Sequence, residues 1–594
     1  MNALLDVEKS LNDACWALKD ADEGLVRDIA RQNGLSFAVA RLLAVRGLSP
    51  DTVPVFLQPS FKALLPEPYL LKDMEAAAKR LAAAVTAHEK IAVFGDYDVD
   101  GETSSAVMKR YLNAVCDNDV TVRIPERDDG YGPTASAMEK FVEQGAKLIV
   151  TVDCGTTAFD AFAAVENKAD VIVVDHHEPD ASLPKVYAVV NPKRLDEPED
   201  NPCRTMAAVG VVFLLVVALN RLLRQQGWFS ADRPEPDIRF LLDLVALGTV
   251  CDVMKLQGVN RLYVKAGLAY LAGRHNKGLA VLSELAGVKG EPDSFQIGFY
   301  LGPRLNACGR IGRADLAFRL LCARDEREAR DIAETLNTLN DQRRDMCAHA
   351  LKQALEEIEK RPEEKPYIFI RGEAWHTGIV GIIAGRLKDR YKLPALVMTN
   401  DKDDPDMLHG SGRSVSGVNL GEAVIAAVEQ GILERGGGHA MAAGFSVRRD
   451  NVQKFDEFFG KYLETHAEPE KLFDRTVCAD ALLDTNAVTP DFLAELKTME
   501  PFGEGNPPPR FVLPNVAVTS VRVLKNGNIS CLLKTNGAGR AVRAIAFKAV
   551  DTGLGVALMQ NKGELMHFLG TVREDFYSGR GQGQFIIEDA AMAV

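Results

Sequence analysis

Short apolar runs, separated by segments of helical length, dominate residues 89–190. Between the runs lie Thr103–Val115 and Ala135–Gln144, which have helical spacing. Runs of four or five residues without polar alternation are typical of strands that are covered on both faces. Strand, helix and strand in this rhythm predict a parallel α/β sheet. The five predicted strands are Ile91–Phe94, Val120–Ile124, Leu148–Val152, Val171–Val174 and Val186–Val190.

The rest of the chain predicts further domains, because 594 residues exceed what a single core supports. Asp315–Lys360 lacks internal Gly and Pro and predicts one or two long connecting helices. Tyr367–Arg371 and Ala395–Met398, with a helix at Val380–Arg390, indicate a second, smaller α/β unit.

About 85 C-terminal residues carry short strands, with a hairpin-type turn at Asn526–Asn528. They predict a small β-barrel of the oligonucleotide-binding (OB) kind. The predicted barrel strands are Phe511–Val518, Ser520–Lys525, Ile529–Lys534, Val542–Phe547, Leu565–Thr571 and Gln584–Glu588. The patterns divide the chain into an N-terminal region at 1–60, the first α/β domain at 61–290, a connector at 291–365, the second α/β domain at 366–470 and the barrel at 471–594.

Bulk composition limits location and partners. Hydrophobic residues make up 47% and charged residues 26%, the balance of a soluble globular protein, and no uninterrupted apolar run reaches the roughly 18 residues typical of a membrane span. No secretory signal opens the chain, and the ten cysteines contain no Cys-x-x-Cys pair. We therefore expect a cytoplasmic protein without a zinc cluster or a disulfide framework. The net charge is −13, yet Pro509–Val594 carries a net +4, which marks the C-terminal end as a candidate polyanion contact.

An aspartate-rich loop follows the first predicted strand. Asp96, Asp98 and Asp100 stand within Gly95–Gly101, and three carboxylates so close together repel one another unless cations are present. The carboxyl edge of an open α/β sheet is where ligands bind. Taken alone, the loop is either a metal site or a solvated acidic turn.

Two isolated aspartates are weaker signals. Asp153 follows the third predicted strand and, taken alone, is better explained as the cap of a helix beginning at Thr156. Asp252 follows an apolar helical segment, which is a common arrangement. Both gain weight if they lie near the aspartate-rich loop.

The segment Asp175-His176-His177 follows the next strand. Asp and His bind Mn²⁺ and related metals, and adjacent histidines can divide their roles, one binding metal and the other donating a proton to phosphate. Surface histidines are the alternative, but several neighbouring strands all end in ligand-type residues. The combined set is rich in oxygen ligands, which favours two Mn²⁺ or Mg²⁺ ions over zinc, with Asp153 as the bridging ligand. It predicts hydrolysis of a phosphorus ester by in-line attack of water.

These segments, taken in order, resemble the DHH phosphoesterase superfamily. The resemblance implies that one set of side chains binds metal: Asp98, Asp100, Asp153, His176 and Asp252. We place Asp175 in the same set, and His177 next to the scissile phosphate. Phe94 stands at a position that is often His in relatives, and Asp96 could take its place as a ligand.

The segment Leu301–Gly312 resembles a motif typical of RecJ exonucleases. Its Arg304, Asn306 and Arg310 could contact the DNA backbone or orient the metal site. A structural glycine-rich turn with a basic surface is the alternative.

Two segments resemble the DHH-associated domain. In Glu434–Gly444, the glycines Gly437 and Gly438 would let the backbone approach a phosphate, and His439 would donate a hydrogen bond to it. In the other segment, Arg413 with Ser414 is a candidate phosphate clamp, because a guanidinium group fits phosphate oxygens in a fork.

The resemblance covers the chain from about residue 50 to its end. It implies a monomeric 5′–3′ exonuclease that is specific for single-stranded DNA, uses two metals, releases 5′-mononucleotides and acts in DNA repair and recombination. A single-strand DNA-binding protein and a helicase are the partners that it implies. A small-substrate DHH phosphodiesterase, acting on short oligonucleotides or cyclic dinucleotides, is the alternative; such relatives typically lack the barrel and the Pro-Arg-x-Asn segment. An inactive scaffold is the third reading, and the intact aspartate and histidine sets argue against it.

Overall fold

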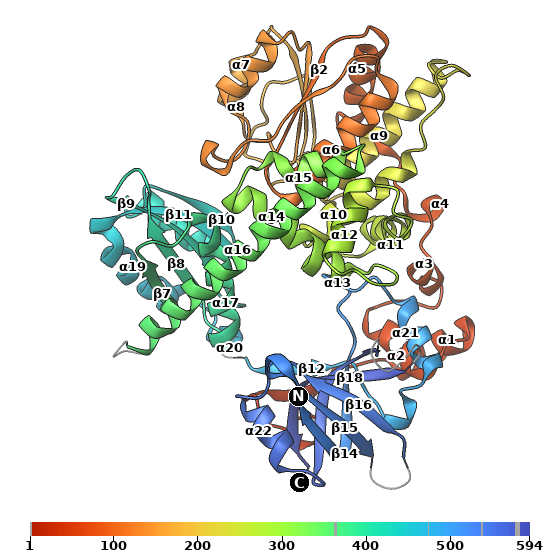
Figure 1. Ribbon diagram of the computed structural model, residues 1–594, viewed down its shortest axis with the longest axis vertical. Helices are drawn as coiled ribbons and strands as arrows, with labels where there is room; N and C mark the ends of the chain where they lie inside the picture. Colours follow the sequence, from red (N-terminus) through yellow and green to blue (C-terminus); the bar gives the residue numbers. More distant parts are fainter. Residues whose placement is uncertain (1–2, 361–364, 473, 536–538, 576–581, 594) are drawn as a thin grey trace.

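The residues that the structure describes form four β-sheets. The computed structural model describes residues 3–360, 365–472, 474–535, 539–575 and 582–593. A first α/β domain, a second α/β domain and a C-terminal barrel lie around a common centre, with both chain ends at the barrel (Figure 1). The predicted fold class is confirmed: a parallel-sheet domain, a helical connector, a smaller α/β domain and an OB-type barrel.

The first α/β domain contains a fully parallel five-stranded sheet. In sheet order its strands are β3 (Thr121–Arg123), β2 (Ile91–Gly95), β4 (Leu148–Val152), β5 (Asp170–Val174) and β6 (Ala188–Val190). The chain leaves β2 toward β3 on one side and returns to β4 on the other. This reversal of direction brings the loops after β2 and β4 together at the carboxyl edge, where open α/β sheets bind ligands.

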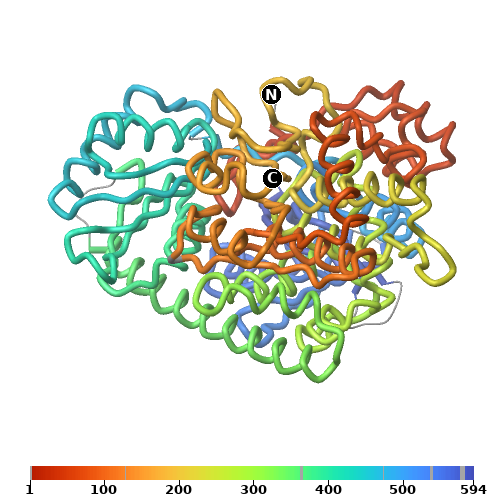
Figure 2. The backbone as a smooth tube through the Cα atoms, turned by 90° about the horizontal axis from the view of Figure 1, so that it is seen from above, coloured from red at the N-terminus to blue at the C-terminus, as the bar shows by residue number. Residues whose placement is uncertain are grey.

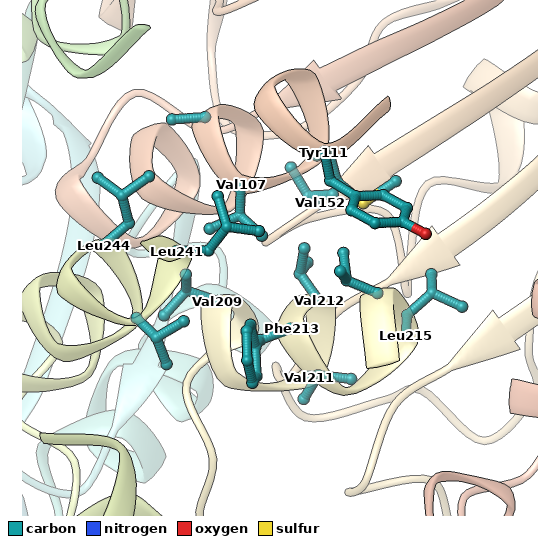
Figure 3. Packing of buried hydrophobic residues seen from close by; sticks show 14 of the residues in the cluster. Val107, Tyr111, Val152, Val209, Val211, Val212, Phe213, Leu215, Leu241 and Leu244 are labelled. Carbon is teal, nitrogen blue, oxygen red and sulfur yellow. The ribbon is translucent and has the colours of Figure 1, made fainter. Parts of the chain in front are cut away.

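Both faces of this sheet are covered, as the uninterrupted apolar strands predict. Val93 and Val150 point into a large core, whereas Phe94 and Ile149 point into a smaller one on the other face. Figure 3 shows part of the large core, in which helices α6 (Val99–Val115) and α9 (Ala208–Gln225) pack against β4. Burial of a Val or Leu side chain stabilises the fold by about 1.5–3 kcal/mol, so this core can support a costly acidic loop at its edge. The large core is formed with α5 (Met74–Thr86), α6 (Val99–Val115), α9 (Ala208–Gln225), α10 (Leu242–Cys251), α11 (Gly258–Ala272) and α12 (Lys277–Leu285), and the smaller core with α7 (Ala135–Glu143) and α8 (Phe159–Ala163).

Helix α9 is apolar enough, and at 18 residues long enough, to cross a membrane by length and composition. Most of it is buried within the large core of the first domain, between α5, α6 and α10. Its apolar sequence is therefore accounted for by packing.

The predicted connector forms two helices, α15 (Asp315–Cys322) and α16 (Glu326–Glu359). They separate at Asp325, whose carboxylate caps α16 by accepting hydrogen bonds from the first free backbone N–H groups. Residues such as Leu336 pack on the core of the first domain, whereas Ala350 and others further along pack on the second. Helix α16, green in Figure 2, thus joins the two α/β domains as one rod.

The second α/β domain is built on a mixed sheet, covered on one face by α16 and α17 (Thr377–Tyr391) and on the other by α18 (Leu420–Glu429) and α19 (Val452–His466). The glycine-rich segment forms a hairpin in this sheet, although glycine weakens strand propensity. Cross-strand pairing compensates, for example between Gly437 and Gly444. In sheet order the strands are β10 (Arg435–His439), β11 (Ala442–Arg448), β9 (Met407–Arg413), β8 (Ala395–Asn400) and β7 (Ile368–Gly372).

The C-terminal barrel is closed by pairing of its first long strand, β14 (Arg510–Val523), with β17 (Leu565–Glu574). Two predicted strands, Phe511–Val518 and Ser520–Lys525, form a single strand with a register shift between Val518 and Ser520. The predicted hairpin turn is present, with positive φ at Asn526 and Gly527. In sheet order the strands are β13 (Ala481–Leu482), β14 (Arg510–Val523), β15 (Ile529–Thr535), β16 (Ala541–Ala546), β18 (Gly583–Met592) and β17 (Leu565–Glu574).

The N-terminal region packs on the barrel, although it carries no recognisable motif. Strand β1 (Cys15–Leu18) pairs in parallel with β12 (Thr476–Ala479). The helices that follow share one core with the barrel, which makes the two chain ends a single structural unit. These helices are α1 (Glu23–Asn33), α2 (Phe37–Val45) and α3 (Val53–Leu57).

Candidate active site

The aspartate-rich loop after β2 is held by local backbone interactions. Asp98 caps α6, because one of its carboxylate oxygens accepts hydrogen bonds from the backbone N–H groups of Asp100 (2.9 Å) and Gly101 (3.1 Å). Gly101 is required here, since a Cβ atom at this position would lie 2.5 Å from the Asp96 carbonyl oxygen. The loop therefore closes tightly and turns its three carboxylates toward the sheet edge.

Asp100 also joins the loop to helix α9. Its carboxylate accepts hydrogen bonds from the backbone N–H groups of Ala208 (2.6 Å) and Val209 (3.0 Å) in the first turn of that helix. A helix N-terminus favours negative charge, so α9 stabilises this buried carboxylate. The apolar core helix thereby has a direct electrostatic contact with the candidate site.

Asp153 does not cap a helix, so the interpretation that was favoured for this residue taken alone is wrong. The next helix, α8, begins only at Phe159. Asp153 has a φ of 61°, its side chain is buried, and its Oδ1 atom has no hydrogen-bond partner among the residues that the structure describes. A buried carboxylate oxygen without a partner is costly, which indicates that a ligand belongs beside it.

The structure brings the aspartates and His176 together in overlapping groups, each with ligand atoms within 4.8 Å of one another. Asp153 and His176 each belong to two of the groups. The Nε2 atom of His176 lies 3.3 Å from Asp153, 3.6 Å from Asp252 and 3.8 Å from Asp100, measured to carboxylate oxygens. The three groups are Asp96, Asp98 and Asp153; Asp100, His176 and Asp252; and Asp153, His176 and His177.

The electrostatics of this cluster fit divalent cations. Burial and the charge of Asp98 raise the pKa of Asp96 to about 8 and that of Asp100 to about 7. Burial and the charges of Asp100 and Asp98 raise the pKa of Asp252 to about 8. Within the described part of the chain, buried oxygens of Asp96, Asp153 and Asp252, and the Nδ1 atom of His176, lack hydrogen-bond partners. Oxygen-rich sets with one imidazole suit Mn²⁺ or Mg²⁺, so the residues fit the cations predicted from the sequence.

Asp175 was predicted as a metal ligand, but the structure does not place its carboxylate in these groups. Its Oδ2 accepts hydrogen bonds from the backbone N–H and hydroxyl of Thr156, and its Oδ1 lies 2.8 Å from Nδ1 of His177. Burial opposes ionisation, but these hydrogen bonds outweigh it and lower the pKa of Asp175. The side chain is thus occupied in orienting His177. Phe94, at the position that is often His in relatives, points into the smaller core, while Asp96 lies in the cluster.

Helix α14 (Gly302–Ile311) carries the predicted RecJ-type motif and packs against the aspartate-rich loop. A Cβ atom at Gly309 would lie 2.4 Å from the carbonyl oxygen of Tyr97, so only glycine permits this approach. Arg310 bridges to the second domain, because its guanidinium donates to the Gly378 carbonyl at 3.1 Å. Arg127, from the loop after β3, donates to the carbonyl of Gly309 at 2.8 Å.

Arg304 and Asn306, also predicted in the site, have different surroundings. Arg304 donates to the Asn337 side chain on α16 (2.9 Å) and to the carbonyl of Tyr300 (2.7 Å). Its guanidinium therefore fastens α14 to the connecting helix. Asn306 is half-buried on α14, and its side chain makes no hydrogen bond within the described part of the chain.

In the second domain, Arg413 is half-buried on β9 and donates to the hydroxyl of Ser411 at 3.0 Å. Ser414, predicted to share in a phosphate clamp, is fully buried and donates to the carbonyl of Val418 at 2.8 Å. Side chains alternate along a strand, so Ser411 lies on the same face as Arg413 and Ser414 does not. Ser411 is thus the serine placed to act with Arg413, which corrects the sequence-based expectation.

The glycine-rich hairpin contributes exposed backbone. Gly437 is half-buried, Gly438 has a φ of 150°, and His439 is exposed at the end of β10. A Cβ atom at Gly438 would lie 2.3 Å from the Ala442 carbonyl oxygen, so glycine is needed for the hairpin itself. These residues lie together at the end of the hairpin.

A row of arginines lies where the two α/β domains meet. It consists of Arg127, Arg310, Arg343, Arg386 and Arg413. Burial, together with repulsion from Arg127, Arg343 and Arg413, lowers the pKa of Arg310 to about 10. Burial and the charge of Arg386 likewise lower the pKa of Arg343 beside it. Among the residues that the structure describes, none of these five forms an ion pair with a carboxylate, in a chain whose net charge is −13. Such a row is suited to an anionic ligand.

Sequence reasoning missed Arg127, Tyr131 and Ser411. Arg127 and Tyr131 lie in the loop after β3, and the rule that ligands bind at the carboxyl edge could have singled out that loop as well. Ser411 could have been found from strand alternation once Arg413 was chosen. The contribution of Arg343 depends on how α16 packs, which has no sequence signal.

Comparison with known proteins gives the same arrangement. The DHH family N-terminal domain matches residues 90–249, the DHHA1 domain matches 364–465 and the RecJ OB domain matches 479–589. The single-stranded-DNA-specific exonuclease RecJ of Bacillus subtilis (strain 168) is 32% identical over 583 residues, which cover 97% of this chain and 71% of that protein.

Solved structures agree with the sequence matches. RecJ from Thermus thermophilus in complex with Mn²⁺ superposes with a TM-score of 0.80 at 29% identity, covering 97% of this chain and 79% of the other. An exonuclease RecJ bound to manganese gives a TM-score of 0.57 at 32% identity, covering 68% of this chain and 98% of the other. Because sequence, domain order and overall fold all agree over nearly the whole length, the chain belongs to the RecJ family.

Proposed function

We propose that this protein is a metal-dependent exonuclease that hydrolyses single-stranded DNA. The observation that carries the proposal is a buried carboxylate and imidazole cluster next to arginines without carboxylate partners in the described part of the chain. Carboxylates bind divalent cations, and guanidinium groups bind phosphate oxygens. The substrate class follows from the relatives, which are single-stranded-DNA-specific exonucleases.

Mn²⁺ or Mg²⁺ would be held in two neighbouring positions. Asp96, Asp98 and Asp153 would hold one ion, and Asp100, His176 and Asp252 the other, with Asp153 shared between them. When bound, a pair of such ions activates water and stabilises the entering and leaving oxygens of an in-line displacement.

The protein's own side chains would position the strand for that displacement. Asp175 fixes the His177 ring through Nδ1 at 2.8 Å, and the ring held in this way would face the scissile phosphate. Arg310 would attract the same phosphate group or its neighbour. Arg304 and Asn306 would support the site from α14, and the hydrogen bonds of Arg304 to α16 favour a positioning role.

The second α/β domain would hold the end of the strand. Arg413 and the backbone of Gly437 and Gly438, with His439, would bind the 5′-terminal phosphate, so that the first phosphodiester lies at the metal cluster. A 5′-mononucleotide would then leave, in the 5′–3′ direction implied by the family resemblance. The net +4 of the barrel segment supports a strand-binding role for the OB domain.

The experiment is to incubate the protein and Mn²⁺ or Mg²⁺ with single strands carrying a 5′ or a 3′ label. We expect release of the 5′ label as a mononucleotide at early times, while the 3′ label stays in long products. Asp153→Ala should abolish cleavage, because it removes the shared ligand, and should leave strand binding largely intact.

Two results would contradict the proposal. Turnover of cyclic dinucleotides or short oligonucleotides without degradation of long strands would favour the small-substrate alternative. Wild-type turnover by Asp153→Ala would exclude Asp153 from the metal site. The barrel and the Leu301–Gly312 segment, both present here, support the exonuclease over that alternative.

The cellular setting is also part of the proposal. The protein would act as a monomer in the cytoplasm, in DNA repair and recombination. A helicase would supply the single strand, and a single-strand DNA-binding protein would present it. Co-purification from cell extract, with and without nuclease treatment, would test whether either partner binds the protein directly.

A further inference from the structure

Tyr131 lies in the loop between β3 and α7, at the same sheet edge as the metal-site cluster. The glycines on either side of it, Gly130 and Gly132, have φ values of 93° and 80°. Such values are rarely adopted by other residues, so the Gly-Tyr-Gly sequence lets the backbone turn sharply on both sides of the tyrosine. This path brings Tyr131 against the ends of β4 and β5.

The hydroxyl group of Tyr131 contacts residues from both of those strand ends. It donates a hydrogen bond to the main-chain carbonyl of Asp153 at 3.1 Å. The same oxygen lies 3.0 Å from Nδ1 and 3.2 Å from Nε2 of His177, with the two rings edge to face at 5.4 Å between centroids. The Tyr131 hydroxyl group is therefore close to both nitrogen atoms of the His177 ring.

His177 is thus held from two directions. Asp175 lies 2.8 Å from Nδ1, in a carboxylate that is itself fixed by Thr156. Tyr131 lies against the ring from the loop after β3. Without the Tyr131 hydroxyl, the hydrogen bond with Asp175 would still allow the ring to tilt, since a single hydrogen bond defines one atom and not a plane.

We infer that Tyr131 is a positioning residue that sets the orientation of the His177 ring relative to Asp153. The inference rests on the proposed function, in which His177 faces the scissile phosphate. It assigns a second role to the loop after β3, which also carries Arg127 of the arginine row. Tyr131 is 53% exposed, so its aromatic ring adds little packing, and its hydroxyl contacts are what distinguish it from an ordinary surface tyrosine.

The test is a double-mutant cycle on single-stranded DNA with Mn²⁺, using Tyr131→Phe, His177→Gln and the double variant. We expect Tyr131→Phe to lower kcat about tenfold, the size of one lost hydrogen bond to a reacting group, with KM unchanged. In the His177→Gln background the same change should have no further effect, because Tyr131 acts through His177. Tyr187→Phe is the matched control, since Tyr187 is 48% exposed, lies at the opposite edge of the same sheet and should leave kcat unchanged.

Two readouts do not depend on turnover. Mn²⁺ affinity measured by calorimetry should be the same for Tyr131→Phe and the wild type. With ¹⁵N-labelled histidine, the ring signals of His177, identified by their loss in His177→Gln, should shift in Tyr131→Phe and stay in place in Tyr187→Phe.

Three results would overturn the inference: wild-type kcat for Tyr131→Phe, an undiminished tenfold loss in the His177→Gln background, or weakened Mn²⁺ binding, which would place the effect at Asp153. Absence of DNA degradation by the wild-type protein would instead count against the proposed function, and the histidine signals would still report on Tyr131.

Discussion

Asp243, in the first turn of α10, is a buried carboxylate outside the active site. Burial raises its pKa to about 6, although Arg110 and a backbone hydrogen bond from Leu244 oppose the shift. In the unfolded chain an aspartate titrates near about 3.9. The folded state therefore retains a proton that the unfolded state loses between these pH values, so Asp243 destabilises the fold progressively as pH rises through this range.

We predict that Asp243→Asn removes this penalty. The gain in the free energy of unfolding should be absent near pH 4, grow up to about pH 6 and then level off at up to about 3 kcal/mol. For a domain of this size that corresponds to about 2–4 °C in melting temperature per kcal/mol, measured by calorimetry across the pH range. Asp237→Asn is the control, because Arg239 lowers the pKa of this exposed carboxyl and no gain should follow. An equal gain at pH 4 and pH 8 would contradict the argument.

At the residue scale, the sequence could identify most of the metal-site cluster but not what each side chain does. Asp98, Asp100 and Asp153 follow strands, and strand ends meet at one edge, so their convergence was predictable. Asp175 could not be separated from them by position, because its role depends on hydrogen bonds from Thr156 and His177. Ligand-type residues can be recognised from sequence, whereas the partners that occupy their lone pairs cannot.

Helix α16 is the element on which alignment of the two α/β domains depends. Its 34 residues correspond to about 51 Å, and its two halves belong to different cores. Gln342 is exposed between these halves, so a substitution there does not disturb packing. Proline at this position would remove a helical hydrogen bond and cost about 3 kcal/mol or more, relieved by a kink.

We predict that Gln342→Pro lowers exonuclease activity about 100-fold, because a shift of about 1 Å between Arg413 and the metal cluster is enough for such a loss. Mn²⁺ binding should persist, since the ligands all come from the first domain. Gln342→Ala is the matched control and should behave as the wild type. Activity of Gln342→Pro within twofold of the control would show that α16 does not set the alignment.

At the element scale, long and strongly patterned segments were predictable, and glycine-rich ones were not. The break between α15 and α16 has a local signal in Asp325, a good helix cap, so two helices could have been preferred over one. The hairpin at Gly437 has no such signal, because its strands exist only through pairing with each other and with β9. Tertiary context overrides propensity there.

At the scale of the whole molecule, the two α/β domains and the barrel with its N-terminal helices have separate cores. Phe61 and Leu65 pack on the first domain, whereas Phe56 and Leu57 pack with the barrel, so the natural boundary lies near residue 58. Leu472 still packs on the second domain. Arg261, on α11 of the first domain, links this domain to the segments that precede and follow the two α/β domains. Its guanidinium donates hydrogen bonds to the main-chain carbonyls of Phe56, Met499, Glu500 and Pro501. In a fragment without those segments, water can take their place at its guanidinium.

We predict that a fragment of residues 59–472 keeps the chemistry on a short single strand but loses affinity for long ones. The metal cluster and the arginine row lie entirely within the fragment, so kcat on a hexanucleotide should change little. The barrel segment carries a net +4, and each phosphate contact on a single strand adds about 0.7 to the slope of log K against log salt concentration. The slope for a long strand should therefore be smaller for the fragment than for the full chain, measured by fluorescence anisotropy.

A fragment of residues 1–472 is a poor substitute, because helices α1–α3 would expose the apolar faces that the barrel covers. Equal affinities and equal slopes for the fragment and the full chain would place all strand binding in the α/β domains and leave the barrel without a role in it.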